Sequence, residues 1–246
     1  MMNRMGIIGA MIEEIELLEQ SLAEKKTTEK AGTTFLEGTL HGLPVVVTKC
    51  GVGKVNAAMS TQILIDTFEV SAILFTGVAG AVDPRLGIGD IVISEDCMQH
   101  DMDVTALGFE RGVIPFQEES VFKADRQLAD LAYEKGKAVC QSPVWRGRIL
   151  SGDQFIADKE QGRQLHAQLG GMCTEMEGAA VAQVCSLNKR PFVIIRSMSD
   201  RADGSAHENF AEFTKLASRH SFEMSAAIVQ ALAESENASH VSRTVE

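Results

Sequence analysis

Two charged residues, Arg196 and Asp200, follow the apolar run 191–195. If that run is a strand that continues, both side chains point to one side, because side chains alternate along a strand. An arginine and an aspartate at the mouth of a buried strand indicate a site more than a surface pair, with a structural ion pair as the alternative. A carboxyl group in such a site could act as a general acid or base.

Two acidic pairs stand at the start of predicted helices. Glu13 and Glu14 follow the apolar run 5–10, and Glu175 and Glu177 stand two residues apart before a stretch rich in Ala and Val. In extended geometry Glu175 and Glu177 share a face, and they need partners because an unpaired buried charge is costly. The plain alternative for each pair is a helix N-terminus, where acids interact favourably with the helix dipole.

Several familiar site patterns are absent or incomplete. The glycines of segment 76–81 permit close approach of a ligand but also suit a tight turn. Segment 51–55 is not a P-loop, and no Gly-x-Gly-x-x-Gly follows the first predicted strand. The sequence has no Gly-x-Ser-x-Gly, which disfavours acyl transfer on a hydrolase fold. Segment 100–103 holds a His and two Asp, but no second His or Cys cluster completes a coordination sphere, so no metal is expected.

The elements that must position these residues alternate between strand and helix patterns along the whole chain. The predicted strands are 5–10, 35–40, 45–50, 72–75, 90–94, 144–150 and 191–195. The predicted helices are 11–22, 53–68, 124–137, 159–169, 179–187 and 207–234. This alternation is typical of an α/β domain with a largely parallel sheet, which binds ligands beyond the carboxyl ends of its strands. We expect a single domain over residues 1–235 and a disordered tail over 236–246.

Composition narrows the class of protein. The chain has 246 residues, 45% of them hydrophobic and 23% charged, with a net charge of −11. Negative charge without a basic stripe argues against a nucleic-acid partner. The five cysteines form no Cys-x-x-Cys, which indicates a reducing, cytoplasmic setting. No apolar run has the length of a signal peptide core or a membrane span, so no membrane partner is expected.

Taken together and in order, these segments resemble the bacterial 5′-methylthioadenosine/S-adenosylhomocysteine nucleosidases over residues 5–232. The resemblance is carried by Gly6-Ile7-Ile8-Gly9-Ala10-Met11 with Glu14, Gly51-Val52-Gly53-Lys54-Val55-Asn56-Ala57-Ala58, Thr76-Gly77-Val78-Ala79-Gly80, Gly89-Asp90-Ile91-Val92, His100-Asp101-Met102-Asp103-Val104-Thr105-Ala106, Ser151-Gly152-Asp153-Gln154-Phe155-Ile156, Glu175-Met176-Glu177 and Arg196-Ser197-Met198-Ser199-Asp200.

The resemblance implies the nucleoside phosphorylase fold, a three-layer α/β/α domain with a mixed, largely parallel central sheet, and a homodimer. It implies hydrolysis of the N-glycosidic bond of 5′-methylthioadenosine and S-adenosylhomocysteine, and also of 5′-deoxyadenosine. No redox or metal cofactor is implied.

The same resemblance assigns roles to single residues. Asp200, held by Ser199, is the acid that protonates adenine N7. Glu14 is the base for the attacking water, which Arg196 helps to place, and Glu177 bonds the ribose hydroxyls. The other implied substrate contacts are Met11 and Val52 at the sugar and thio-substituent, Met176 at the ribose, Glu175 in the shared motif, Phe155 and Ile156 at the base, and Phe210 over the pocket.

Leu107 and Pro115 match positions that complete the pocket of the neighbouring subunit. Two positions depart from the family pattern. Val78 stands where some members carry Ser, which removes a hydroxyl near the ribose or the water. Leu107 stands where some members carry Phe, which alters the 5′ pocket.

Three other functions fit parts of the pattern. A nucleoside phosphorylase or a futalosine hydrolase could share the fold, and a non-catalytic nucleoside-binding protein could share the pocket. The joint presence of Glu14, Glu177 and Asp200 argues against pure binding, which needs no acid and base. No Arg occurs between Met11 and Arg85, and the two acids there would repel a phosphate, so hydrolysis is favoured over phosphorolysis.

Overall fold

One mixed sheet forms the middle of the molecule in the computed structural model. The structure describes residues 3–202 and 206–243; for residues 206–212, 214 and 237–243 it describes the backbone only. In this described part the strands are β1 (Met5–Gly9), β2 (Ala23–Lys30), β3 (Thr33–Leu40), β4 (Leu43–Lys49), β5 (Ala72–Ala81), β6 (Ile91–Gln99), β7 (Val121–Lys123), β8 (Val144–Ser151), β9 (Gly171–Glu175) and β10 (Phe192–Asp200). The helices are α1 (Ile12–Ser21), α2 (Lys54–Asp66), α3 (Arg126–Val139), α4 (Lys159–Leu169), α5 (Gly178–Leu187) and α6 (Ala206–Arg243), with a short 3₁₀ turn, η1 (Thr105–Leu107).

The strand order is β10-β6-β8-β9-β5-β1-β4-β3-β2, with β7 paired to β6. β10 also pairs with β5, so one half of the sheet curls round and closes on itself. β4, β1, β5 and β10 are mutually parallel neighbours in this sheet. Their carboxyl ends therefore meet at one edge, as expected for a ligand site.

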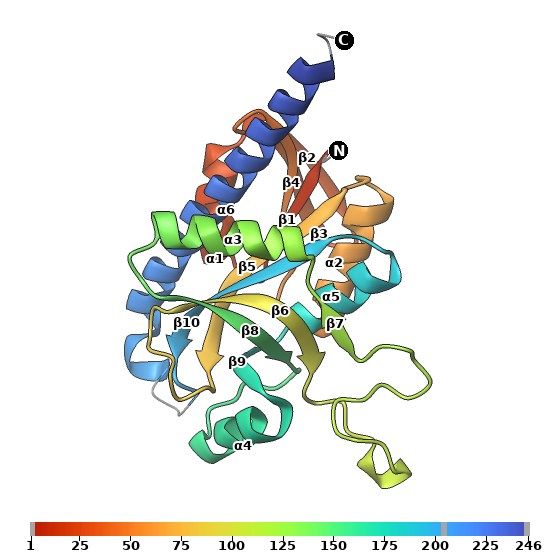
Figure 1. Ribbon diagram of the computed structural model, residues 1–246, viewed down its shortest axis with the longest axis vertical. Coiled ribbons are helices and arrows are strands. Elements are labelled where there is room, and N and C mark those ends of the chain that lie inside the picture. The colour runs from red at the N-terminus through yellow and green to blue at the C-terminus, as the bar shows by residue number, and fades with distance from the viewer. Residues whose placement is uncertain (1–2, 203–205, 244–246) are drawn as a thin grey trace.

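Helices cover both faces of the sheet, so consecutive side chains of the central strands are buried although they point to opposite faces (Figure 1). Ile8 and Ile194 pack in the core shared with α2 and α5. Their neighbours Ile7 and Val193 face the opposite core, which α1, α3 and α6 close. The expected three-layer α/β/α fold is therefore confirmed.

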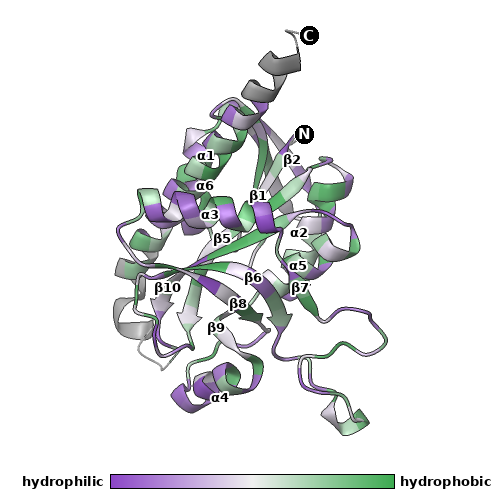
Figure 2. Cartoon of the chain, viewed as in Figure 1, coloured by the Kyte–Doolittle hydropathy of each residue, from purple (hydrophilic) through white to green (hydrophobic). Residues whose placement is uncertain are grey.

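The hydropathy of the elements agrees with this layering. Figure 2 shows mainly hydrophobic residues along the central strands and mainly hydrophilic ones on α4, which packs beside β9. Within the part of the chain that the structure describes, no helix is long and apolar enough to cross a membrane.

Several predicted boundaries are wrong. β5 runs on to Ala81, so segment 76–81 is strand where a turn was the favoured interpretation. β2 and β9 were not predicted, because their short or polar sequences lack a clear apolar run.

α6 continues to Arg243 past the expected end at Glu234, which places regular helix in part of the predicted tail. No Gly or Pro occurs after Glu234 to stop a helix. The assignment of residues 1–235 to a single domain stays a prediction.

Candidate active site

A cavity of about 260 Å³ opens at the carboxyl ends of β1, β5, β9 and β10. It is lined by Ala10, Met11, Glu14, Val52, Val78, Ala79, Gly80, Gln154, Phe155, Ile156, Thr174, Glu175, Met176, Glu177, Ser199 and Asp200. Segments far apart in the sequence thus meet here as the strand order requires. A larger hollow of about 480 Å³ lies between the end of β5 and α4. Its acids are engaged in ion pairs, Asp83 with Arg85 and Glu160 with Arg163, so the smaller cavity is the better candidate.

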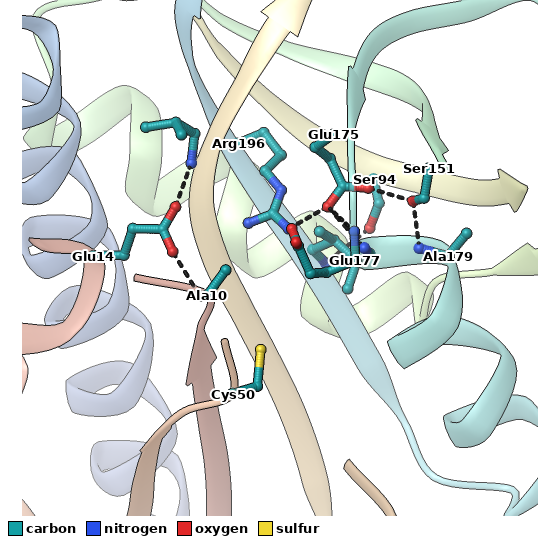
Figure 3. Close-up of polar contacts among 12 residues, drawn as sticks. Ala10, Glu14, Cys50, Ser94, Ser151, Glu175, Glu177, Ala179 and Arg196 are labelled. Carbon is teal, nitrogen blue, oxygen red and sulfur yellow. Dashed lines mark hydrogen bonds and ion pairs between the residues drawn. The ribbon is translucent and has the colours of Figure 1, made fainter. Parts of the chain in front are cut away.

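Arg196 lies beneath the cavity with 1% of its surface exposed. Its Nη2 donates to Glu175 Oε2, and the same nitrogen lies 3.9 Å from Glu177 Oε2 (Figure 3). The guanidinium carbon also lies 3.9 Å from the centroid of the Phe75 ring, a cation–π contact. Among the described residues, Nε and Nη1 have no hydrogen-bond partner. Arg196 therefore holds Glu175 and Glu177 at the floor of the cavity, while its Nε and Nη1 donors have no partner among the described residues.

Glu14 is fixed by backbone N–H groups from two strand ends. Its Oε2 accepts from the N–H of Ala10 at 2.6 Å and of Met11 at 2.9 Å, while Oε1 accepts from the N–H of Val78 at 2.9 Å. Burial raises the pKa of Glu14, against the opposing charge of Arg196 and these hydrogen bonds. The carboxyl group is therefore rigidly aimed and more basic than an exposed one.

Gly77 on β5 makes room for Glu14 and Arg196 to come together. A Cβ at this position would lie 2.8 Å from Glu14 Cδ and would also collide with Arg196 Nη1. The β5–β10 register places Gly77 directly opposite Arg196. Gly77 therefore serves the approach of two side chains, Glu14 and Arg196, whereas the prediction for this segment was the approach of a ligand or a turn.

Glu175 is engaged on both oxygens. Oε1 accepts from Ser151 Oγ, whose oxygen in turn accepts from the N–H of Ala179 at 2.6 Å. Oε2 accepts from the N–H of Gly178 at 2.7 Å and from Arg196. Glu175 was predicted to contact substrate, but its carboxylate is already used to hold Arg196 and the start of α5.

Glu177 lies beside Glu175 and faces the cavity. Its Oε1 accepts from the N–H of Gly53 at 2.7 Å. Burial, together with the negative charge of Glu175, raises the pKa of Glu177 to about 7, and Arg196 opposes the shift. The outer oxygen stays available for hydroxyl groups of a ligand.

Asp200 is the last residue of β10 and also lines the cavity. Its Oδ2 accepts from Ser199 Oγ at 2.8 Å, and Oδ1 accepts from the N–H of Ala202 at 2.7 Å. A Cβ on Gly80 would lie 2.9 Å from Oδ1, so Asp200 sits beside Gly80. Glu14 bonds Val78, two residues earlier on β5, which is about 7 Å along a strand. The two carboxyl groups therefore reach the same cavity at separate points along β5.

The apolar walls of the cavity come from predicted residues. Met11, Val52, Val78, Phe155, Ile156 and Met176 all line it. Phe155 is 61% exposed and Val52 is 51% exposed, whereas Ile156 is buried. Wide apolar surfaces left open at the mouth of a cavity suit a flat ligand that covers them.

Leu107 and Pro115, which were predicted to complete the pocket of the neighbouring subunit, do not line this cavity, and Leu107, in η1, is 72% exposed. The side chain of Phe210 lies outside the described residues.

The sequence analysis missed other contributors: the N–H of Gly53, the aromatic support from Phe75, and the cavity-lining Gln154 and Thr174. Gln154 directly precedes the predicted Phe155, which was the available signal. Within the described chain, no group of three or more His, Cys, Asp or Glu side chains could hold a metal ion.

Comparison with known proteins places this geometry in a family. Residues 4–232 match the sequence profile of the phosphorylase superfamily. The 5′-methylthioadenosine/S-adenosylhomocysteine nucleosidase of Halalkalibacterium halodurans is 42% identical over 229 residues, which cover 93% of this chain and 98% of that protein. The nucleosidase of the same name from Haemophilus influenzae is 41% identical over 219 residues, covering 89% of this chain and 94% of that protein.

Solved structures agree. The 5′-methylthioadenosine/S-adenosylhomocysteine nucleosidase from Neisseria meningitidis, in complex with methylthio-immucillin-A, matches with a TM-score of 0.89 at 36% identity, covering 93% of this chain and 99% of that one. The nucleosidase from Colwellia psychrerythraea, in complex with adenine, matches with a TM-score of 0.87 at 39% identity, covering 93% of this chain and 95% of that one. The chain therefore belongs to the phosphorylase superfamily and, within it, to the 5′-methylthioadenosine/S-adenosylhomocysteine nucleosidases.

Proposed function

We propose that the protein hydrolyses the N-glycosidic bond of 5′-methylthioadenosine, S-adenosylhomocysteine and 5′-deoxyadenosine, and releases adenine. The observation that carries the proposal is one cavity lined by two buried carboxyl groups, Glu14 and Asp200, which lie beside different residues of β5. A glycosidic bond held between them has an acid for the leaving base and a base for water. The family relationship supplies the substrate class.

Asp200 is the proposed general acid. An adenine anion is a poor leaving group, and a proton on N7 lets the base leave neutral. Ser199 and the N–H of Ala202 hold the carboxyl group in one orientation at the end of β10. Phe155 and Ile156 form the wall against which the base would lie. A positioned general acid contributes roughly 10²–10⁴-fold to the rate.

Glu14 is the proposed general base for water. Its raised pKa, caused by burial, makes it a stronger base than an exposed carboxylate. Arg196 Nη1, without a partner among the described residues, lies close to the Glu14 carboxylate and supports the placing of a water there. Attack from the side opposite the leaving base is the geometry of an inverting glycosidase.

Glu177 is the proposed ligand of the ribose hydroxyls. The sugar becomes positively charged as the bond breaks, and the surrounding acids stabilise that charge. Glu14, Glu175 and Glu177 face a single buried cation, Arg196, so the floor of the cavity favours a cation over an anion. The same excess of acids disfavours a phosphate dianion, which separates this proposal from a phosphorylase.

We also propose that the active species is a homodimer in which Leu107 and Pro115 of one subunit complete the pocket of the other. Leu107 and Phe116 are 72% and 97% exposed, and Phe116 packs edge-on against Phe109. An exposed apolar patch of this kind is typical of an interface.

The free thiols support the proposed cytoplasmic location: Cys50, Cys97, Cys140, Cys173 and Cys185 are unpaired in the described chain, and all but Cys140 are buried. Cell fractionation would check that location.

Replacing Asp200 by Asn should abolish adenine release and leave the fold intact. The amide keeps the shape and the contacts to Ser199 and Ala202 but cannot deliver a proton. Steady-state release of adenine from 5′-methylthioadenosine, with circular dichroism as the folding control, measures this. Activity above about 10% of wild type would reject Asp200 as the acid, since a lost acid costs about 10²-fold or more.

Glu14→Gln should lower turnover by about 10²-fold or more while substrate binding is kept. The glutamine can still accept the N–H bonds of Ala10, Met11 and Val78 through its oxygen, although not all at once. Calorimetric titration with 5′-methylthioadenosine separates the two effects. If binding is lost together with turnover, Glu14 has only the structural role of a residue at a helix start.

Adenine release should be equally fast in phosphate-free buffer and in millimolar phosphate, with free thioribose as the sugar product. Product analysis by mass spectrometry identifies the sugar. Phosphate-dependent turnover, or a sugar 1-phosphate, would assign the protein to the phosphorylases of the same superfamily.

Sedimentation at nanomolar concentration should show a dimer, and Leu107→Asp should give monomers with reduced turnover. The matched control is Val139→Asp, at an exposed position at the end of α3, which should leave both unchanged. A fully active wild-type monomer would exclude a pocket shared between subunits.

A further inference from the structure

Three charged residues outside the cavity form a closed ring of hydrogen bonds. Lys54 Nζ donates to Asp101 Oδ1 at 2.7 Å, the N–H of Asp153 donates to Asp101 Oδ2 at 2.9 Å, and the N–H of Lys54 donates to Asp153 Oδ1 at 2.8 Å. We call Lys54, Asp101 and Asp153 the clasp. Its members come from the start of α2, the end of β6 and the loop after β8, and none of them has a role in the proposed reaction.

The clasp begins where a strand ladder ends. β6 and β8 are parallel, and their register stops at Gln99 opposite Ser151. The N–H of His100 still donates to the carbonyl of Ser151 at 2.9 Å. At Asp101, two residues after the last paired residue of β6, the side-chain carboxylate accepts the N–H of Asp153 in place of a backbone carbonyl. The side chain thus extends the tether between the two segments beyond the strands.

The clasp also caps α2. The residue before this helix, Gly53, has no side chain to accept the first free N–H groups, which most helices satisfy with Ser, Thr, Asp or Asn. Asp153 supplies that acceptor from a distant part of the chain. Gly53 has φ of 97°, and a Cβ there would lie only 3.2 Å from Asp153 Oδ1. Glycine is therefore needed both for the backbone and for the approach of the cap.

The ring joins the two walls of the cavity. On one side, Val52 lines the cavity, and the N–H of Gly53 holds Glu177. On the other side, the cavity-lining residues Gln154, Phe155 and Ile156 follow Asp153 in the loop. The spacing between the ribose side and the base side therefore depends on contacts made outside the cavity.

Two members of the clasp, Lys54 and Asp101, are shielded from solvent, whereas Asp153 is exposed. The side chains of Lys54 and Asp101 are 19% and 14% exposed, and Lys54 Nζ also donates to Gln99 Oε1 at 2.9 Å. Although burial acts against it, the hydrogen bonds from Lys54 and from the N–H of Asp153 hold the pKa of Asp101 below its usual value. Below the loop, the buried His100 ring leaves no space for a Cβ on Gly152, at 2.5 Å from its Cε1. The loop is thus held from two sides.

We propose that Lys54, Asp101 and Asp153 are positioning residues, which set the distance between the wall that holds the ribose and the wall that holds the base. This inference rests on the proposed function, since it assigns those walls to the two parts of the nucleoside. The clasp does not touch the reacting atoms. It should therefore act equally on bound substrate and transition state, an effect that appears in KM and not in kcat.

The test is steady-state kinetics with 5′-methylthioadenosine on Lys54→Met, Asp101→Asn and the double variant. Each single change should raise KM about tenfold and change kcat less than threefold. The double variant should be no worse than either single one, because the two residues belong to one interaction. Calorimetric titration with adenine, which meets only the base wall, should show a smaller loss of affinity than the rise in KM.

Lys137→Met is the matched control, since Lys137 pairs with Glu134 on the exposed surface of α3, and its KM should stay at the wild-type value. A role in stability alone would lower the melting temperature and the amount of active enzyme without moving KM. KM within twofold of wild type in both single variants would overturn the proposal. If Lys54→Met does not fold, Asp101→Asn, which keeps its volume, decides the question. Wild-type enzyme without adenine release would instead refute the proposed function.

Discussion

The buried guanidinium of Arg196 is the interaction on which the rest of the site depends. It lies among Glu14, Glu175 and Glu177, and the acids could not all be charged in so apolar a place without it. Burial still raises the pKa of Glu14, and burial together with the charge of Glu175 raises the pKa of Glu177. The single positive charge of Arg196 therefore does not balance the negative charge that Glu14, Glu175 and Glu177 carry when ionised. A site in that state gains from a ligand that becomes cationic as it reacts.

Backbone N–H groups, more than side chains, offset the free-energy cost of burying these carboxylates. Glu14 takes N–H groups from the ends of β1 and from β5, Glu175 takes them from the start of α5, and Glu177 takes one from the start of α2. Such donors are immobile and carry no net charge. The carboxylates are thereby oriented before any ligand arrives, which is the form of preorganisation that lowers a reaction barrier most effectively.

Sequence reasoning could predict the elements whose patterns are local. The apolar run of β10 and the acids after it were sufficient to single out Arg196 and Asp200, and the alternation of patterns was sufficient for the layers. It could not predict that Glu175 is consumed by Ser151, Gly178 and Arg196, because those contacts join separate parts of the chain. It also read the glycines of 76–81 as a turn, since a strand that needs Gly77 for the passage of two side chains has no local signature.

The pairing of β10 on both of its edges limits where the sequence of this enzyme can gain or lose residues. β10 is bonded to β5 on one side and to β6 on the other, while β2 forms an open margin at the far end of the order. A shift of β10 by one residue would turn Arg196 and Asp200 to the opposite face and break both ladders at once. Insertions and deletions in β10 should thus be lethal to function, whereas the β2–β3 margin can lengthen, shorten or acquire new segments without disturbing the chemistry.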